Sequence, residues 1–272
     1  MDSSVLSYSL ELVAGSGITL SVEQRVALQT AMVLLKKNYK FHRVLFWGKI
    51  LGIKKDYFIA QGRGEDEMQG KKYLYSFNCM DWFLLPLATD SMIKEVTKAA
   101  KSRFIGDPSA MENEPCNSSS ESDCSWFQAT VNEESRLAVT IHQIDEEASV
   151  VPRGAFVKNP HGLVQINRSF GGLSHSEARR LDNFLHFSKA KNPKKTVREV
   201  GVVNETIDFL DVLMDDIPKG SWSLQLECAS NVCVLRSLLW PGLTLFHVPM
   251  TPQHGYVYIG DGKKNLDLPF VL

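Results

Sequence analysis

The sequence lacks a long apolar run and a strong net charge, and each absence narrows the class of protein. No apolar stretch approaches the roughly 18 residues that suggest a membrane span. The formal net charge is -1 over 272 residues, so no global field favours nucleic acid or an anionic membrane surface. The N-terminus has neither the basic region nor the cleavage-site pattern of a signal peptide. We therefore expect a protein of the cytosolic compartment.

Paired cysteines are also missing. An odd set of cysteines without a C-x-x-C pair predicts neither a disulfide framework nor a zinc knuckle. Reduced and partly buried thiols are the expectation, with Cys228 and Cys233 on neighbouring strands of one hairpin. The five are Cys79, Cys116, Cys124, Cys228 and Cys233.

Motifs that carry catalysis or bind metal are absent as well. The seven histidines form no H-x-x-x-H or H-E-x-x-H pattern, and no G-x-S-x-G nucleophile elbow occurs. Asp215 and Asp216 are adjacent, so on a helix their side chains diverge, and we interpret them as surface acids at a helix end. The sequence predicts no catalytic, cofactor-binding or metal-binding residue.

One glycine-rich stretch, GYVYIGDGKKNLDLPF (255–270), must be assigned either to a phosphate-binding loop or to a turn after a strand. Gly255 and Gly260 have the separation of a P-loop, but Asp261 stands where the phosphate-binding lysine is needed. No helix is expected after it, because the following residues are a poor helix start. We interpret Gly260 to Gly262 as a tight turn after a strand, with glycine supplying a positive φ.

Apolar periodicity in the N-terminal region, residues 1–40, predicts two helices. The first runs from Val5 to Val13, and the second begins with a capping box formed by Ser21 and Gln24. Its buried face should contain Leu28, Ala31, Met32 and Leu35. Residues 43–78 then change to aromatic and β-branched segments punctuated by glycine, which is typical of an antiparallel meander. A further helix should begin with Asp90 as its cap.

Residues 107–125 are rich in serine and acids and poor in bulky apolar groups. Such a segment cannot bury enough surface to offset ordering, so we expect a flexible loop. Ser118 and Ser120 each have an acid three residues later, which is an acidic-kinase pattern that leaves their modification undecided.

The second half of the chain predicts both helices and strands. Helices are expected over 134–144, after a capping box at Ser174 and Glu177, and after Asn204. Residues 150–157 and the C-terminal region, 216–272, should form strands, and WSLQLEC (222–228) alternates as a strand with one solvated face. The helix after Ser174 should carry Ala178, Leu181 and Leu185, and the one after Asn204 should carry Ile207, Leu210, Leu213 and Met214. Together these elements predict one α+β domain over residues 1–272, with an antiparallel sheet core flanked by helices.

Two features of the sequence are candidates for contact with partners. The basic run from Lys189 to Arg198 is interpreted as a solvated linker, with a patch for an acidic protein and nucleic-acid binding as alternatives. The chain also has five tryptophans, most of them expected in the core and one or two on a contact surface. They are Trp47, Trp82, Trp126, Trp222 and Trp240.

Several long segments resemble the radial spoke head proteins of motile cilia and flagella. The resemblance runs nearly end to end through residues 43–62, 104–109, 136–157, 167–187, 216–227, 234–249 and 255–270. The segments SLLWPG and GYVYIG are also similar to the four- and six-type spoke head paralogues.

The resemblance implies a non-catalytic subunit of the axonemal radial spoke head, without cofactor, metal or catalytic residues. Its partners would be other spoke head proteins, especially the four- and six-type paralogues, together with stalk components and the central pair, but no nucleic acid or membrane. It would help to assemble the head and relay central-pair signals to the dynein arms, residing in the axoneme and, before assembly, in the cytoplasm. The alternative is a soluble cytosolic enzyme with a dispersed active site.

Overall fold

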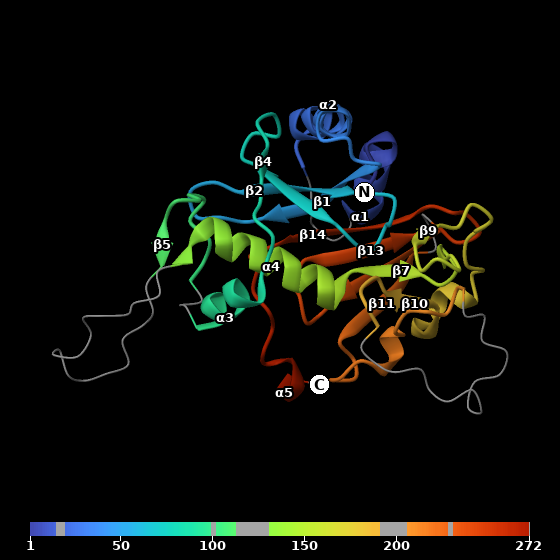
Figure 1. Cartoon of the computed structure of the whole chain (residues 1–272). Coiled ribbons are helices and arrows are strands. Elements are labelled where there is room, and N and C mark those ends of the chain that lie inside the picture. The colour runs from blue at the N-terminus through green and yellow to red at the C-terminus, as the bar shows by residue number, and fades with distance from the viewer. Residues whose placement is uncertain (15–19, 99–101, 113–130, 191–205, 228–230, 272) are drawn as a thin grey trace.

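An eight-stranded mixed sheet forms the centre of the protein (Figure 1). The computed structural model describes residues 1–14, 20–98, 102–112, 131–190, 206–227 and 231–271. The expected α+β class is confirmed, since helices lie against this sheet. The strands, in their order across the sheet, are β11 (Trp222–Glu227), β12 (Val232–Ser237), β13 (Leu243–His247), β14 (His254–Gly260), β1 (Arg43–Ile50), β2 (Tyr57–Arg63), β3 (Lys72–Ser76) and β4 (Phe83–Leu84).

A single parallel pair joins the N-terminal meander to the C-terminal strands. β1 and β14 run parallel with Gly48 opposite Tyr258, whereas the other pairs of this sheet are antiparallel. A Cβ added at Gly48 would lie 2.0 Å from the Tyr258 carbonyl oxygen, so only glycine permits this close approach. The sheet core is therefore mixed, where the sequence predicted antiparallel pairing alone.

Both faces of the central strands are buried. Along β2, Tyr57 and Ile59 belong to one hydrophobic cluster and Phe58 and Ala60 to another, as the alternation of side chains in a strand requires. The expected solvated face occurs on the edge strand β11, where Gln225 is exposed. The sheet thus has two cores, one on each side.

Two N-terminal helices cover one of these faces. They are α1 (Leu6–Val13), which follows a short 3-10 turn, η1 (Ser3–Val5), and α2 (Val22–Asn38). Both hydrogen bonds of the Ser21–Gln24 capping box are formed, and the predicted apolar face of α2 is buried. This part of the chain folds as its sequence predicts.

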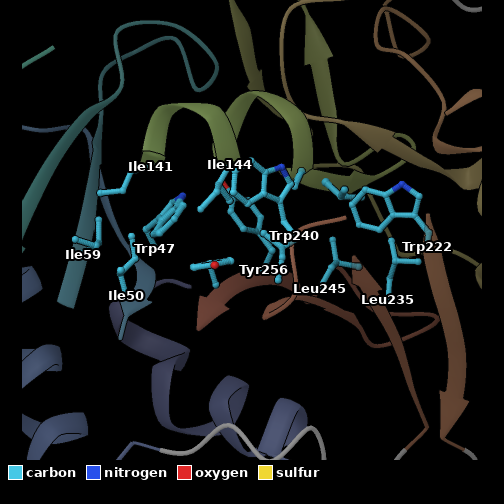
Figure 2. Packing of buried hydrophobic residues seen from close by; sticks show 14 of the residues in the cluster. Trp47, Ile50, Ile59, Ile141, Ile144, Trp222, Leu235, Trp240, Leu245 and Tyr256 are labelled. Carbon is cyan, nitrogen blue, oxygen red and sulfur yellow. The ribbon is translucent and has the colours of Figure 1, made fainter. Parts of the chain in front are cut away.

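Helix α4 (Glu133–Ala148) covers the opposite face. It begins at an Asn132 cap, whose side chain accepts a hydrogen bond from the Ser135 amide, and it is longer than the predicted 134–144. Ile141 and Ile144 of α4 lie near Trp47 of β1 and near Trp240, which follows β12 (Figure 2). Trp222 is buried too, while Trp82 is partly buried, which confirms the core position expected for most of the tryptophans. Trp126 lies outside the described residues.

The strands of the small two-stranded sheets come between β4 and β11 in chain order. Residues 150–157, predicted as one strand, form two strands separated by a turn in which Gly154 has φ +85°. The pairs are β7 (Val150–Pro152) with β10 (Phe184–His186), β8 (Phe156–Lys158) with β9 (Val164–Ile166), and β5 (Met111–Glu112) with β6 (Val131–Asn132).

The helices predicted after Ser174 and Asn204 are wrong. The Ser174–Glu177 capping hydrogen bonds form, but only the 3-10 turns η3 (Glu177–Arg179) and η4 (Leu181–Asn183) follow. Leu185 lies in β10 because pairing with β7 holds the backbone extended, and Leu185 also bridges Val212. Ile207 and Leu210 are not helical, and Leu213 and Met214 lie in the 3-10 turn η5 (Leu213–Asp215). Asn204 and residues 191–198 of the basic run lie outside the described residues.

Three further expectations need adjustment. Helix α3 (Asp90–Lys98) includes Asp90, and its capping oxygen is Thr89 Oγ1, which accepts from the Met92 amide at 3.4 Å. The predicted flexible loop 107–125 is partly ordered, because Met111 and Glu112 pair in β5; residues 113–125, with Ser118 and Ser120, lie outside the described part. A short helix, α5 (Leu268–Val271), follows the glycines of the stretch 255–270, where the sequence predicted none. Within the described chain, no helix combines the length and apolarity needed to cross a membrane.

Candidate functional site

A buried carboxylate on α4, Asp145, connects the helix to several strands of the sheet. Its Oδ1 accepts hydrogen bonds from Trp47 Nε1 at 3.2 Å, Gln61 Nε2 at 3.2 Å and the Tyr256 hydroxyl at 2.9 Å. Its Oδ2 lies 2.5 Å from Lys71 Nζ. Four donors therefore surround one carboxylate, which is the arrangement that a buried charge requires.

The charge on Asp145 is stabilised by neighbouring cations. Burial alone would raise the pKa of Asp145, but Lys71 and then Arg63 oppose it and lower the pKa to about 2. A carboxylate of such low pKa, with both oxygens engaged, is a poor general base at neutral pH. Asp145 is thus suited to holding structure rather than to moving protons.

An ion pair between Arg63 and Glu67 extends this network. Arg63 Nη1 lies 3.0 Å from Glu67 Oε2, and both side chains are only 3% exposed. Arg63 Nε donates to Gln61 Oε1 at 2.8 Å, and its guanidinium lies over the Phe187 ring. Since Gln61 also donates to Asp145, the two ion pairs form one connected cluster. We call Asp145, Lys71, Arg63, Glu67 and Gln61 the charge cluster.

A second buried carboxylate, Glu133, begins α4 and holds a loop. Its oxygens accept from the backbone amides of Ile105, Gly106 and Asp107 at 2.7, 2.7 and 3.1 Å. The Tyr57 hydroxyl donates to the same side chain at 2.7 Å, and burial together with this bond raises the pKa of Tyr57. Glu133 thereby fixes residues 105–107 to the helix and to strand β2.

Side-chain hydrogen bonds hold four of the histidines, which are His175, His186, His247 and His254. His247 Nε2 accepts from the Leu173 amide at 3.1 Å, so its Nδ1 carries the proton and donates to the Gln253 carbonyl. Burial lowers the pKa of His247. Burial likewise lowers the pKa of His254 to about 4. Among the described residues, no group of three His, Cys, Asp or Glu could hold a metal ion.

Asp216 has a role that sequence analysis missed. The prediction of a plain surface acid is wrong, because Asp216 Oδ2 accepts from Trp222 Nε1 at 2.7 Å and Oδ1 lies 2.8 Å from His186 Nε2. These contacts connect the turn after η5 to β10 and to β11. The partners are six and thirty positions away in sequence, so no local pattern could have identified both.

Two of the five cysteines lie within the described residues. Cys79 and Cys233 are free and buried, which confirms the expected reduced thiols for this pair. Burial raises the pKa of each to about 12, so neither thiol is activated as a nucleophile. Cys116, Cys124 and Cys228 lie outside the described residues.

The glycine-rich stretch at 255–270 lies in the sheet and in the segment after it. Gly255 and Gly260 belong to β14, and Gly262 has φ +74°, as the predicted turn requires. The Gly262 amide donates to the Tyr258 hydroxyl at 2.9 Å. These glycines serve backbone geometry within the sheet.

A groove of about 1030 Å³ opens beside the charge cluster. α4 lines one side with His142, Asp145 and Glu146, and Lys71 lies directly before β3. The other walls include residues from the segments 68–70, 85–88, 158–162, 188–190 and 206–210. The groove contains ionisable groups, but the more buried of its two carboxylates, Asp145, is already paired with Lys71. It is therefore a surface feature without an assembled catalytic constellation among the described residues.

Comparison with known proteins identifies the family. Residues 4–156 match the model for radial spokehead-like proteins. Over the full length of both chains, the sequence is 58% identical to a radial spoke head protein 9 homolog of Danio rerio. It is 48% identical to the Bos taurus homolog and 47% identical to the Homo sapiens homolog, again over both full chains. The chain belongs to the radial spokehead-like family.

Proposed function

From this family membership, we propose that the protein is a non-catalytic structural subunit of the radial spoke head in the axoneme of motile cilia and flagella. The observation that carries the proposal is identity of 47–58% to radial spoke head protein 9 homologs over complete chains. Such similarity extends to every part of the sequence, as a shared role in an assembly would require.

The buried ionisable groups support a structural role. Asp145 and Glu133 each use their oxygens to hold other segments, and the sheet is covered on both faces. A sheet packed on two sides with internal polar ties resists deformation, which suits a subunit that bears cyclic load. The continuous sheet, which contains strands from both halves of the chain, supports treating residues 1–272 as one domain.

The proposed partners are other radial spoke head proteins, in particular the four- and six-type paralogues, and components of the stalk. The head would contact the central pair, and the protein would help to relay central-pair signals to the dynein arms. It would reside in the cytoplasm before its assembly into the axoneme. Interfaces of permanent complexes often bury about 2,000 Å² or more, so we expect a broad contact surface.

An enzymatic role is the alternative, and the groove is where it would reside. It would need a side chain in the groove that is free to act as acid or base. Asp145 is bound by four donors, which favours the structural interpretation.

Purification from cilia tests the proposal directly. A tagged chain is recovered from salt-extracted axonemes of motile cilia, and co-purifying proteins are identified and quantified by mass spectrometry. Stoichiometric recovery with the four- and six-type spoke head subunits is the expected result. Recovery of the chain alone, or with unrelated proteins, would show that the proposal is wrong.

A further inference from the structure

The two edges of the eight-stranded sheet differ in how they meet solvent. β4 ends one side and β11 ends the other (Figure 1). β4 has only the two residues Phe83 and Leu84, and Pro86 follows shortly after. Short edge strands and nearby proline are common devices that prevent edge-to-edge pairing. β11 has six residues and contains neither proline nor lysine, so the strand itself has neither of these devices.

The alternation of hydrogen bonds between β11 and β12 shows which backbone groups of β11 point away from the sheet. The Leu238 amide donates to the Ser221 carbonyl at 2.8 Å, so Ser221 and Leu238 are a hydrogen-bonded pair. Hydrogen-bonded and non-bonded pairs alternate along an antiparallel ladder. In the observed register with β12, the N–H and C=O groups of Trp222, Leu224 and Leu226 therefore point away from the sheet. Within the described chain, these three N–H groups have no backbone acceptor.

The sequence around Leu224 is nearly symmetric. The segment SWSLQLE (221–227) has Leu224 at its centre. Moving outward from Leu224, the matching positions are Ser223 and Gln225, then Trp222 and Leu226, then Ser221 and Glu227. In an antiparallel pair of two such strands centred on Leu224, Trp222 of one copy faces Leu226 of the other. Apolar pairs then lie on one face and a Ser223–Gln225 pair on the other, which are favourable cross-strand neighbours. Glu227 faces Ser221, so no like charges meet.

We propose that β11 is a self-pairing edge through which two copies of this chain form a dimer with one continuous sheet. The two-fold axis passes through Leu224, and the outward N–H and C=O groups of Trp222, Leu224 and Leu226 bond to those of the second copy. Pairing of this kind is isologous and closes after two copies. Ile217, five positions before β11, is an apolar side chain that is 90% exposed. The dimer goes beyond the proposed role in the spoke head and forms in the isolated chain.

Proline substitution at matched positions tests the pairing. Leu224→Pro removes an outward N–H without removing a ladder bond to β12, since proline is tolerated where the N–H faces solvent. Leu84→Pro does the same on β4, because the Leu85 amide donates to Tyr73 and Leu84 therefore faces outward. Sedimentation velocity on the purified full chain, over a concentration series, measures the dimer dissociation constant of each protein.

The expected result is a concentration-dependent dimer in the unmodified chain. Leu224→Pro should weaken the dimer by at least about tenfold, while Leu84→Pro should change it by less than about twofold. A monomer throughout the series would overturn the proposal. Equal weakening by the two prolines would overturn it as well.

A cysteine pair tests the register even if Leu224→Pro disrupts folding. At the two-fold axis the two Cα atoms would lie about 5.5 Å apart, within the range for a disulfide. Leu224→Cys should therefore give a covalent dimer under mild oxidation. Ser223→Cys, whose copies would lie about 7–8 Å apart on the diagonal, should cross-link no more than the unmodified chain. Equal cross-linking by both variants, or none by Leu224→Cys, would show that the strands do not pair in this way.

Discussion

Asp145 and Glu133 lie on the same helix, about three turns apart, and both are almost completely buried, yet they are stabilised differently. Glu133 accepts three backbone amides of one loop and a tyrosine hydroxyl. Asp145 accepts side-chain donors from β1, β2 and β14 and pairs with Lys71. The first carboxylate fixes a local turn, whereas the second fixes the helix across the sheet. Removing each should therefore have different consequences.

The largest effect is expected from Asp145→Ala. The substitution leaves Lys71 buried without its anion and removes a negative charge that also stabilises Arg63, so it should lower the free energy of unfolding by about 3–5 kcal/mol. Chemical denaturation followed by tryptophan fluorescence measures the change. Glu146→Ala, the next position on α4, is the matched control and should change the stability by less than about 0.5 kcal/mol. Equal effects of the two substitutions would show that Asp145 contributes no more to the free energy of unfolding than the neighbouring Glu146.

The contribution of Asp145 to the free energy of unfolding should depend on pH, because the pKa of its carboxyl is lowered in the folded protein. Because the folded pKa is about 2 and the ordinary value is 3.8, the stabilisation is present above pH 3.8. It is lost as pH falls through the folded pKa, and it amounts to about 2–3 kcal/mol. His247 adds an earlier loss: its folded pKa is lowered from 6.5, so the unfolded chain gains protons first as pH falls below 6.5.

The stability of the unmodified chain and of Asp145→Ala, measured from pH 7 to pH 2, checks these windows. The curves should run in parallel down to about pH 5 and converge below it. Parallel curves at all pH values would contradict the assigned pKa of Asp145.

Glu133→Gln should have a moderate and local effect. The amide replaces one acceptor oxygen by a donor that faces backbone N–H groups, which should cost about 1–3 kcal/mol. Hydrogen exchange should speed up at the amides of Ile105, Gly106 and Asp107 and remain slow in β1 and β14. Exchange that increases uniformly through the sheet would mean that Glu133 is not a local anchor.

The smallest effects are expected from removing one hydroxyl at each carboxylate. Tyr256→Phe and Tyr57→Phe each delete one hydrogen bond to a buried acid and should cost about 1.5 kcal/mol. Tyr256→Phe should also raise the pKa of Asp145, since that hydroxyl contributes to lowering it. Carbon-detected NMR titration of the Asp145 carboxyl measures the pKa, and an unchanged value would contradict the assigned contact.

Local patterns predicted the local features well. The Ser21–Gln24 capping box, the buried face of α2 and the strands of both meanders required only neighbouring residues. The helix predicted around Leu185 failed because pairing with β7, over thirty positions away, outweighed its helical spacing. The parallel pair of β1 and β14 is another long-range choice that no local periodicity reveals.

The polar interior could not be predicted from sequence. Asp145 meets Trp47, Gln61 and Tyr256 across separations of 98, 84 and 111 positions, and a lone aspartate in an amphipathic helix gives no signal of burial. A structure was needed to bring these residues together. The family resemblance, by contrast, depended on long segments and was confirmed by full-length relatives.

The central claim is that the chain acts as a folded scaffold, and the most direct test uses cells that lack their own copy. The groove is also lined by ionisable residues outside the charge cluster, namely His142, Glu146, Lys158 and Lys189, and a quadruple alanine variant removes them. We predict that this variant is incorporated into spoke heads, as measured by quantitative mass spectrometry of axonemes, and restores the ciliary waveform. Normal incorporation with an uncorrected waveform would contradict the scaffold role and indicate chemistry in the groove.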